Sequence, residues 1–296
     1  MNSMLQLVIR HNKLFRRDRM LVLFSLLTVF IVILLYAIFI QKTQVDAIEQ
    51  LVPAAPELKV MVNEWMVAGL LSIITVTSTL AAFGIAIKDM ETKVLADFLT
   101  APISRAKLQL SYVINAFLVG LALSLFGLIC CQIFLVVMGG QWFSPGKISM
   151  LVGVILLSVS LSSVFNLFFT LLVTTQTAFS TLSTIIGTSI GFLCGVYVPL
   201  GSVPEFVQKV IMLFPISHTT VLFREILMRD SINTVFNGDA DAASYYEVYF
   251  GVHYEWNETI ISNGYSLLFI SLSIVVFTVL SLYFYKKVCD ANRTFS

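Results

Sequence analysis

Charged residues are scarce in this sequence. Of its 296 residues, 12% are Asp, Glu, Lys or Arg and 58% are hydrophobic, whereas a typical soluble domain carries about 25% charged residues. Charges are absent from five long intervals, which run between residues 19 and 42, 64 and 88, 107 and 147, 147 and 205, and 258 and 286. This composition excludes a water-soluble fold, and the five uncharged intervals are the expected membrane segments.

The lengths of these intervals predict the number of crossings, because about 20 apolar residues span a bilayer as a helix. The first, second and fifth intervals hold one span each, and the third holds one span that ends at the Gly-rich segment 139–146. The fourth is long enough for a hairpin that turns at the polar cluster 174–177. We predict an all-α integral membrane protein with a single transmembrane domain over 1–296. Its six transmembrane helices are expected at about 20–40, 65–87, 110–138, 148–173, 178–198 and 261–285.

Basic residues are scarce on one side of the predicted membrane. With six spans, 12 of the 18 Lys and Arg residues fall on the side of the two termini, and 12 of the 17 acidic residues fall on the other. Because Lys and Arg stay on the cytoplasmic side, both termini are expected in the cytoplasm. The first span follows five basic residues and precedes no small-residue cleavage site, so we interpret it as an uncleaved anchor.

Several kinds of chemistry lack the residues they need. No Asp, Glu, Lys, Arg or His lies within a predicted span, which disfavours proton- or ion-coupled carriers and intramembrane aspartyl proteases. His and Cys are scattered, and the neighbours Cys130 and Cys131 would point in different directions on a helix, so no metal site is predicted. The outer loops have no cysteine and imply no disulfide framework. The Gly146-Lys147 pair lacks the other residues of a phosphate-binding loop.

Polar residues inside the spans are almost all hydroxyl-bearing. Small polar residues favour close helix contact and interhelical hydrogen bonds, but they also suit a translocation pathway. Both interpretations stay open. The pathway candidates are Thr75, Ser78, Ser162, Asn166, Thr184 and Thr188. Gly187, Gly191 and Gly195 form a small-residue ridge for helix packing, within one chain or between two.

Two amphipathic segments are expected on the cytoplasmic side. In residues 1–19, apolar residues recur at helical spacing opposite basic ones, which predicts an interfacial helix; the alternative is that the basic residues only fix the topology. Residues 88–105 mix charges with an apolar face and reach Pro102, which stops a helix. This segment is either a short cytoplasmic helix or a loop with a purely topological role.

The longest outer segment covers residues 199–260. Its first part, up to Asp230, is apolar and interrupted by Pro215, and each half is too short to span. We therefore predict a re-entrant helical hairpin before the last span. After Asp230, acidic and aromatic residues alternate in a mixture that suits the headgroup level.

Two stretches of this sequence resemble the permease subunits of type-2 ABC transporters, bacterial exporters of drugs and antibiotics. One is Phe98-Leu99-Thr100-Ala101-Pro102-Ile103-Ser104-Arg105, after the acidic residues that begin at Asp89. The other comprises Gly195-Val196-Tyr197-Val198-Pro199, then Val203-Pro204, then Leu213-Phe214-Pro215-Ile216-Ser217-His218. The topology is similar over the whole chain. One departure is Lys93-Val94, where the family often has Gly-Thr.

The resemblance implies a multi-pass protein of the bacterial plasma membrane that exports its cargo. The segment 88–105 would be a coupling helix that docks on a separate ABC ATP-binding subunit, with the N-terminal helix beside it. ATP and Mg would belong to that partner, so this chain would be a transport subunit without a cofactor and not an enzyme. A second permease copy or a similar permease, and membrane lipid, are the other expected partners, and no nucleic acid is expected. The coupling candidates are Arg10, Arg17, Asp89, Glu91, Phe98, Leu99, Pro102 and Arg105. The outer-gate candidates are Pro199, Pro215, His218, Arg224 and Glu225.

Several functions stay open at this point. An exporter for an amphiphilic drug, peptide antibiotic or lipid-like molecule is the first. A polysaccharide or glycolipid export permease of the same family is the second. A stand-alone membrane carrier or enzyme for lipid-like substrates would need a catalytic or ion-relay group within the spans. A regulatory or assembly protein with a permease-like topology would lack an ATP-binding subunit encoded next to it.

Overall fold

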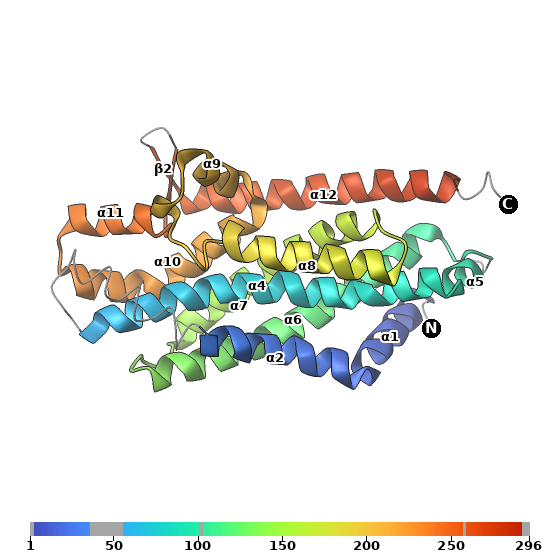
Figure 1. Ribbon diagram of the computed structural model, residues 1–296, viewed down its shortest axis with the longest axis horizontal. Coiled ribbons are helices and arrows are strands. Elements are labelled where there is room, and N and C mark those ends of the chain that lie inside the picture. The colour runs from blue at the N-terminus through green and yellow to red at the C-terminus, as the bar shows by residue number, and fades with distance from the viewer. Residues whose placement is uncertain (1–2, 36–55, 101–102, 257–258, 292–296) are drawn as a thin grey trace.

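The structure, a computed structural model, describes residues 3–35, 56–100, 103–256 and 259–291, and most of these residues are helical (Figure 1). The helices in chain order are α1 (Ser3–Arg17), α2 (Arg19–Leu35), α4 (Pro56–Glu91), α5 (Val94–Thr100), α6 (Arg105–Val137), α7 (Pro145–Thr170), α8 (Gln176–Leu193), the 3₁₀ turn η2 (Leu200–Ser202), α9 (Glu205–Leu213), α10 (Pro215–Phe236), α11 (Ala240–Tyr249) and α12 (Asn263–Ala291). The strands β1 (Tyr254–Trp256) and β2 (Thr259–Ile261) form a small antiparallel hairpin before α12.

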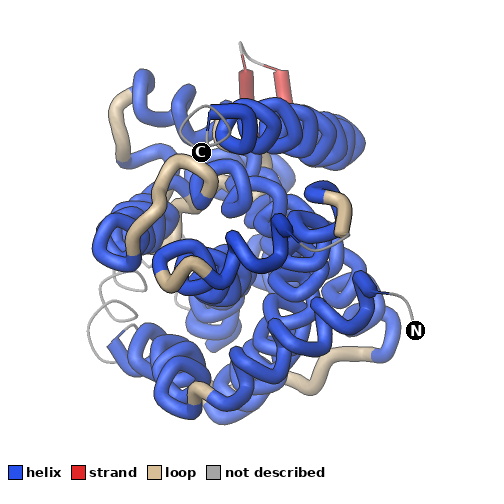
Figure 2. Tube along the Cα trace, turned by 90° about the vertical axis from the view of Figure 1, so that its right-hand side faces the viewer, coloured by secondary structure: helices blue, strands red, loops and turns tan. Residues whose placement is uncertain are grey.

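Helix α4 lies at the centre of the bundle, with the other long helices around it (Figures 1 and 2). It contacts α6, α7, α8 and α10, and 78% of its most apolar stretch is buried. Helix α12 packs on one side only, against α7 and α10, and only 17% of its apolar stretch is buried. Its exposed residues include Leu268, Val275 and Leu282. Such an apolar outer surface suits contact with lipid.

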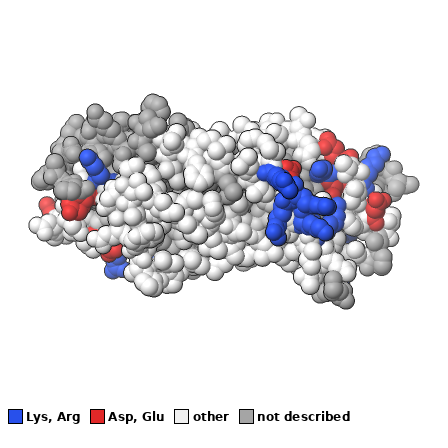
Figure 3. Space-filling view, turned by 90° about the horizontal axis from the view of Figure 1, so that it is seen from below, with Lys and Arg blue, Asp and Glu red and all other residues white. Residues whose placement is uncertain are grey.

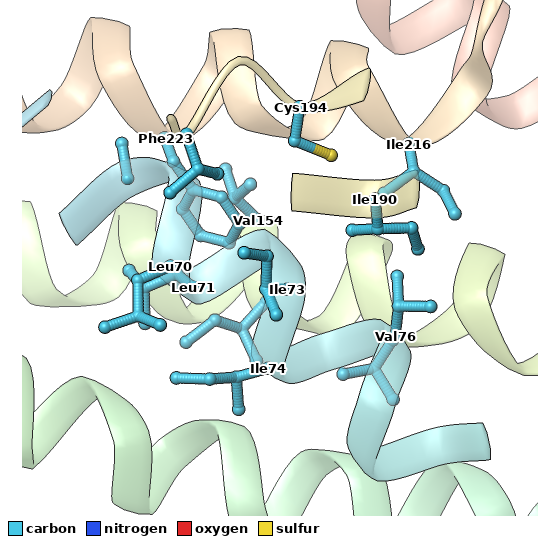
Figure 4. Close-up of a cluster of buried hydrophobic side chains, with 14 of the residues drawn as sticks. Leu70, Leu71, Ile73, Ile74, Val76, Val154, Ile190, Cys194, Ile216 and Phe223 are labelled. Atoms are coloured by element: carbon cyan, nitrogen blue, oxygen red, sulfur yellow. The ribbon is translucent and has the colours of Figure 1, made fainter. Parts of the chain in front are cut away.

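The middle of α4 forms the core with side chains from three other helices. Residues Leu70 to Val76 of α4 meet Val154 of α7, Ile190 of α8 and Phe223 of α10 (Figure 4). Two glycines of α6 let its backbone approach α4 closely. A Cβ at Gly127 would lie 2.8 Å from Ile74 Cδ1, and one at Gly120 would overlap Thr79. Small residues at membrane helix interfaces generally allow such close packing of two helices.

Short polar residues set the starts of three long helices. Ser104, Ser144 and Thr175 precede α6, α7 and α8, and each side-chain oxygen accepts a hydrogen bond from the backbone N–H three residues later. This N-capping satisfies a donor that the helix itself leaves unpaired. Pro145 occupies the first turn of α7, where its missing N–H costs nothing.

Four described helices are long and apolar enough to cross a membrane: α4, α6, α7 and α12. Helices α9 and α10 together could form a fifth span, bent by 90° at their junction. The described part of α2 has 17 residues and is too short for this group, whereas α8 has 18 residues but is too rich in Ser and Thr. A helical, multi-pass membrane protein is therefore confirmed, while six crossings remain a prediction.

Several boundaries differ from those predicted. Helix α4 begins at Pro56 and not near residue 65, because Glu57, Lys59 and Glu64 interrupt the apolar run without interrupting the helix. The break at Pro215 is present, but α10 continues past Asp230 to Phe236. Helix α8 ends at Leu193, before the predicted end at 198.

Candidate functional site

The candidate site lies at the end of the bundle where α1, α5 and the C-terminal turn of α4 meet. Arg10 of α1 donates two hydrogen bonds to the carboxylate of Asp89 on α4, at 2.6 and 2.8 Å. Tyr112 Oη of α6 donates a third, at 2.7 Å. The Asp89 side chain is 6% exposed and that of Arg10 is 32% exposed. The bidentate pair joins α1 to α4, and the Tyr112 hydrogen bond adds α6, so one carboxylate links three helices.

His11, next to Arg10, completes this cluster on its buried side. Its Nε2 lies 3.1 Å from Ser111 Oγ, and its ring stacks on Tyr112 with centroids 4.1 Å apart. Burial, together with the charge of Arg10, lowers the pKa of His11 to about 4. The hydrogen bonds that Arg10 donates to Asp89 raise the pKa of Arg10 above its ordinary value. The cluster therefore holds one charged pair and a neutral imidazole at pH 7.

Helix α5 contacts the same cluster through Phe98. The Arg10 guanidinium carbon lies 5.0 Å from the centre of the Phe98 ring, within the range of a cation–π interaction. The turn from α4 to α5 passes through Lys93 with φ +62°, a left-handed conformation that favours glycine. This is the position at which the resemblance noted above expects glycine.

Among the described residues, the other coupling candidates make no contact with the Arg10–Asp89 pair. Arg17 and Glu91 are exposed and Arg105 is half-buried. Pro102 lies outside the described residues, as does the side chain of Leu99. The structure thus brings three of the eight candidates, Arg10, Asp89 and Phe98, into direct contact. Sequence analysis missed His11, Ser111 and Tyr112. The spacing of His11, four residues from the buried Leu7 and Phe15, was the signal that could have found it.

A large open cavity of about 1320 Å³ extends from this cluster toward the middle of the bundle. Its walls come from α1, α2, α4 and α8. They include Arg10, Asp89 and Glu91 at one end and Thr77, Ser180 and Ser183 farther along. The cavity is amphiphilic, because its lining combines charged groups at the α1 end with hydroxyl and apolar groups farther along α4 and α8.

The six pathway candidates divide into two groups. Thr75, Ser78, Ser162 and Asn166 are buried. Thr75 Oγ1 lies 2.8 Å from Ser158 Oγ of α7, and Asn166 Nδ2 donates to Thr79 Oγ1 of α4 at 2.8 Å. Thr75 and Asn166 therefore link α4 to α7.

Thr184 and Thr188 lie instead on an exposed face of α8. Each donates its hydroxyl hydrogen bond to α8's own backbone, to the carbonyl oxygens of Ser180 and Thr184. Gly187 belongs to the same part of the helix, and a Cβ there would meet no atom within 4 Å. This face of α8 is unoccupied by the described part of the chain.

A comparison with protein families identifies the chain. The model of the ABC-2 type transporter family matches residues 2–228. The chain belongs to this family. No curated protein sequence matches it. The matched segment of this ABC-2 transporter component contains the Arg10–Asp89 cluster, α8 and most of α10.

At the opposite end of this ABC-2 component, Arg224 of α10 is 2% exposed. Its Nη2 donates to the carbonyl oxygen of Gly195 at 2.7 Å and to that of Cys194 at 3.2 Å, and its Nη1 donates to that of Gly251 at 3.1 Å. Among the described residues, no acid lies within ion-pair distance of Arg224. Backbone carbonyls alone therefore satisfy this arginine's terminal nitrogens.

Trp65 of α4 completes the surroundings of Arg224. The guanidinium carbon lies 4.8 Å from the Trp65 ring centre, and Trp65 Nε1 donates to the carbonyl oxygen of Phe250 at 2.8 Å. The carbonyls that Arg224 and Trp65 bind come from the segment after α8 and from the turn after α11. The central helix is thus joined to the outer segments at this point.

The remaining outer-gate candidates occupy different places. His218 is buried and bonds the Met212 carbonyl oxygen at 2.8 Å and Ser266 Oγ at 3.0 Å, linking α10 to α9 and α12. Glu225 pairs with His253 at 3.2 Å and not with Arg224. Pro199 directly precedes η2, and Pro215 is the first residue of α10.

The three glycines of the predicted ridge do not act as one surface. A Cβ at Gly191 would overlap Tyr197. Gly195 lies beyond the end of α8 with φ +60°, where it turns the chain toward the Arg224 site. Of the three, only Gly187 is open to a second chain.

Sequence analysis also missed a second charged cluster on this side. Lys147, at the start of α7, donates to the Leu227 carbonyl oxygen at 2.8 Å and pairs with Asp230 at 3.3 Å. Its Nζ also lies 3.9 Å from the buried Glu64 of α4. Lys147 stands alone in a long uncharged stretch of sequence, and that isolation was the available signal.

Proposed function

We propose that this chain is the permease subunit of an ABC exporter. It moves an amphiphilic drug, peptide antibiotic or lipid-like molecule outward, and a separate ATPase subunit supplies the energy. The observation that carries this proposal is the Arg10–Asp89–Phe98 cluster, which ties the short helix α5 and the amphipathic helix α1 to the end of the central helix. A partner that moves α5 would act directly on α4.

Helix α4 gives such a movement a route across the membrane. It is 36 residues long and contains Asp89 near one end and Trp65 toward the other. A helix of this length extends about 54 Å. ATP binding by the partner would shift α5 and α1, and α4 would transmit the shift to the segments around Arg224. The two ends of the pathway would then open in alternation.

The proposed subunit crosses the membrane six times, with α1, α5 and both termini in the cytoplasm. Helix α2 would supply the described part of the first crossing, predicted at 20–40, of which residues 36–40 lie outside the described residues, and α8 would supply the fifth. The excess of Lys and Arg on the side of α1 and α5 supports this orientation. A bacterial plasma membrane is the proposed location.

A second permease copy, or a similar permease, would complete the pathway. The exposed face of α8 with Thr184, Gly187 and Thr188, and the amphiphilic cavity beside it, support a pathway between two chains. Thr184 and Thr188 would line it, while the buried Thr75, Ser78, Ser162 and Asn166 would hold each half together. An amphiphilic cavity favours an amphiphilic cargo over a long polysaccharide.

Copurification with an ATPase and export by whole cells test this function together. Glu91→Ala changes an exposed residue at the proposed docking surface, whereas Phe98→Ala and Asp89→Asn weaken the contacts that hold α5 and α1 to α4. We expect each variant to insert normally but to lose most export, with reduced ATPase copurification for Glu91→Ala. Asp241→Ala, an exposed acid of α11, is the matched control. Unchanged export and copurification in all three variants would show that the coupling assignment is wrong.

The substrate class needs its own experiment. Susceptibility profiling of a deletion strain, followed by transport into inverted vesicles, separates amphiphilic compounds from polysaccharides and glycolipids. We expect ATP-dependent uptake of an amphiphile by inverted vesicles. Uptake that persists without the ATPase subunit would instead support a stand-alone carrier.

A further inference from the structure

A groove beside α1 combines basic and apolar surfaces in an arrangement that suits one class of ligand. It has a volume of about 800 Å³ and lies where α1 passes α6. Lys13, Arg16 and Arg17 line it from α1, and Leu118 lines it from α6. Figure 3 views the face that carries α1 and α2 and shows Lys and Arg side chains gathered in one patch toward one end.

The cations of this groove have no counter-charge among the described residues. Lys13, Arg16 and Arg17 are all exposed, and none of them pairs with an acid in the part of the chain that the structure describes. The neighbouring Arg10, by contrast, is neutralised by Asp89. Three clustered, unpaired cations favour a ligand with net negative charge, and they lie on the helix that precedes the first membrane segment.

An apolar stripe continues from the groove along α6. Leu118, Phe126 and Ile133 are 44%, 37% and 50% exposed. Ala122 and Ile129 are also exposed, so the spacing of 4, 4, 3 and 4 residues places all five on one face of the helix. From Leu118 to Ile133 the stripe extends about 22 Å, which exceeds the roughly 15 Å of hydrocarbon in one leaflet.

We propose that this groove binds an anionic phospholipid of the inner leaflet. Its phosphate lies among Lys13, Arg16 and Arg17, and its acyl chains lie along the α6 stripe from Leu118 to Ile133. The basic groove suits the phosphate of such a molecule, and the stripe is long enough to contact its acyl chains. The proposal uses the cytoplasmic position of α1 from the proposed function but does not depend on transport. It reassigns Arg17 from coupling to lipid binding.

Lipid binding by the purified protein tests this proposal. Dioleoyl phosphatidylglycerol and dioleoyl phosphatidylcholine are titrated into the protein in neutral detergent, and bound lipid is counted by native mass spectrometry. We expect one phosphatidylglycerol to bind more tightly than phosphatidylcholine. The variant Lys13→Gln/Arg16→Gln should bind phosphatidylglycerol about thirtyfold more weakly, because it lacks two of the cations that attract the lipid's negative charge. Lys88→Gln/Lys107→Gln removes two exposed cations elsewhere on the same side and should bind like the wild type.

Two further arms keep the test decisive. Leu118→Asn should weaken phosphatidylglycerol binding several-fold without removing charge, and raising salt on the wild type should weaken it as well. Equal binding of the two lipids, or wild-type binding by the double variant, would overturn the proposal. Full competition by glycerol 3-phosphate would mean a headgroup site without acyl contacts and would also overturn it. Normal lipid binding with lost ATPase copurification would assign the groove to the ATPase instead, leaving the transport function itself intact.

Discussion

The two ends of the bundle are each organised around an arginine, but the two arginines bind different groups. At the α1 end, Arg10 pairs with the carboxylate of Asp89 and is about one third exposed. At the opposite end, Arg224 is buried and binds only backbone carbonyls and the face of Trp65. A partly exposed pair can separate and rehydrate, whereas a buried cation held by carbonyls has no alternative partner. The comparison indicates that the junction of α1 with α4 can separate, whereas the outer segments stay attached to α4 and α10 as these helices move.

Removal of Arg224 should have the largest effect. Arg224→Ala leaves the carbonyls of Cys194, Gly195 and Gly251 without donors, so we expect the free energy of unfolding to fall by about 4 kcal/mol. Denaturant unfolding in micelles measures it. Arg229→Ala, an exposed arginine on the same helix, is the control and should change stability by less than about 0.5 kcal/mol. Comparable losses for both variants would contradict this role of Arg224.

Removal of Arg10, the inner arginine, should lower the free energy of unfolding by less than removal of Arg224 does. Arg10→Ala leaves the Asp89 carboxylate buried without its cation, for which we expect a loss of about 3 kcal/mol. Arg10→Ala/Asp89→Asn removes that unpaired charge and should recover part of the loss. The same unfolding assay gives the coupling energy of the pair. Strictly additive effects would mean that the pair contributes nothing beyond its separate members.

The histidines at the two ends should respond to pH in opposite directions. The pKa of His11 is lowered from 6.5 to about 4, so the stability it contributes is full above pH 6.5 and declines as pH falls toward 4. We expect the free energy of unfolding to decline by about 2 kcal/mol over this pH range in the wild type, and we expect this decline to be absent in His11→Gln. The hydrogen bond that His253 donates to the Glu225 carboxylate raises the pKa of His253, so the stability that His253 contributes is present below pH 6.5 and is lost as pH rises. Denaturant unfolding of both proteins from pH 4 to 8 measures these effects. If His11→Gln showed the same slope of unfolding free energy against pH as the wild type below pH 6.5, the role of His11 would be contradicted.

The smallest expected effect is a gain at the inner end. Lys93 adopts φ +62° between α4 and α5, where a glycine avoids the steric cost of a side chain. Lys93→Gly should therefore raise stability by about 1 kcal/mol. Lys107→Gly, within α6, is the contrasting control and should lower it by a similar amount. A loss in both variants would mean that the Lys93 side chain, and not its backbone, matters at this turn.

The sequence predicted the helices better than the contacts between them. Uncharged intervals locate α6 and α7 within a few residues, because hydrophobic length decides a membrane helix. Both Arg10 and Asp89 were candidates, but nothing in the spacing of residues 79 positions apart indicates that they pair. The partners of Arg224 are carbonyl oxygens, which every residue carries, so no side-chain pattern could identify them. His11 lies outside the predicted spans, and only its helical spacing from Leu7 and Phe15 indicates that it is buried.

Site-specific photo-crosslinking tests the central claim most directly. A photoreactive residue replaces Asp97 on the exposed surface of α5 in one variant and Phe206, 76% exposed on α9, in another. The account predicts an ATP-dependent crosslink from position 97 to an ABC ATP-binding subunit in cells, and none from position 206. A crosslink to that subunit from position 206 and not from 97 would reverse the proposed orientation, and crosslinks from neither would contradict the coupling role of α5.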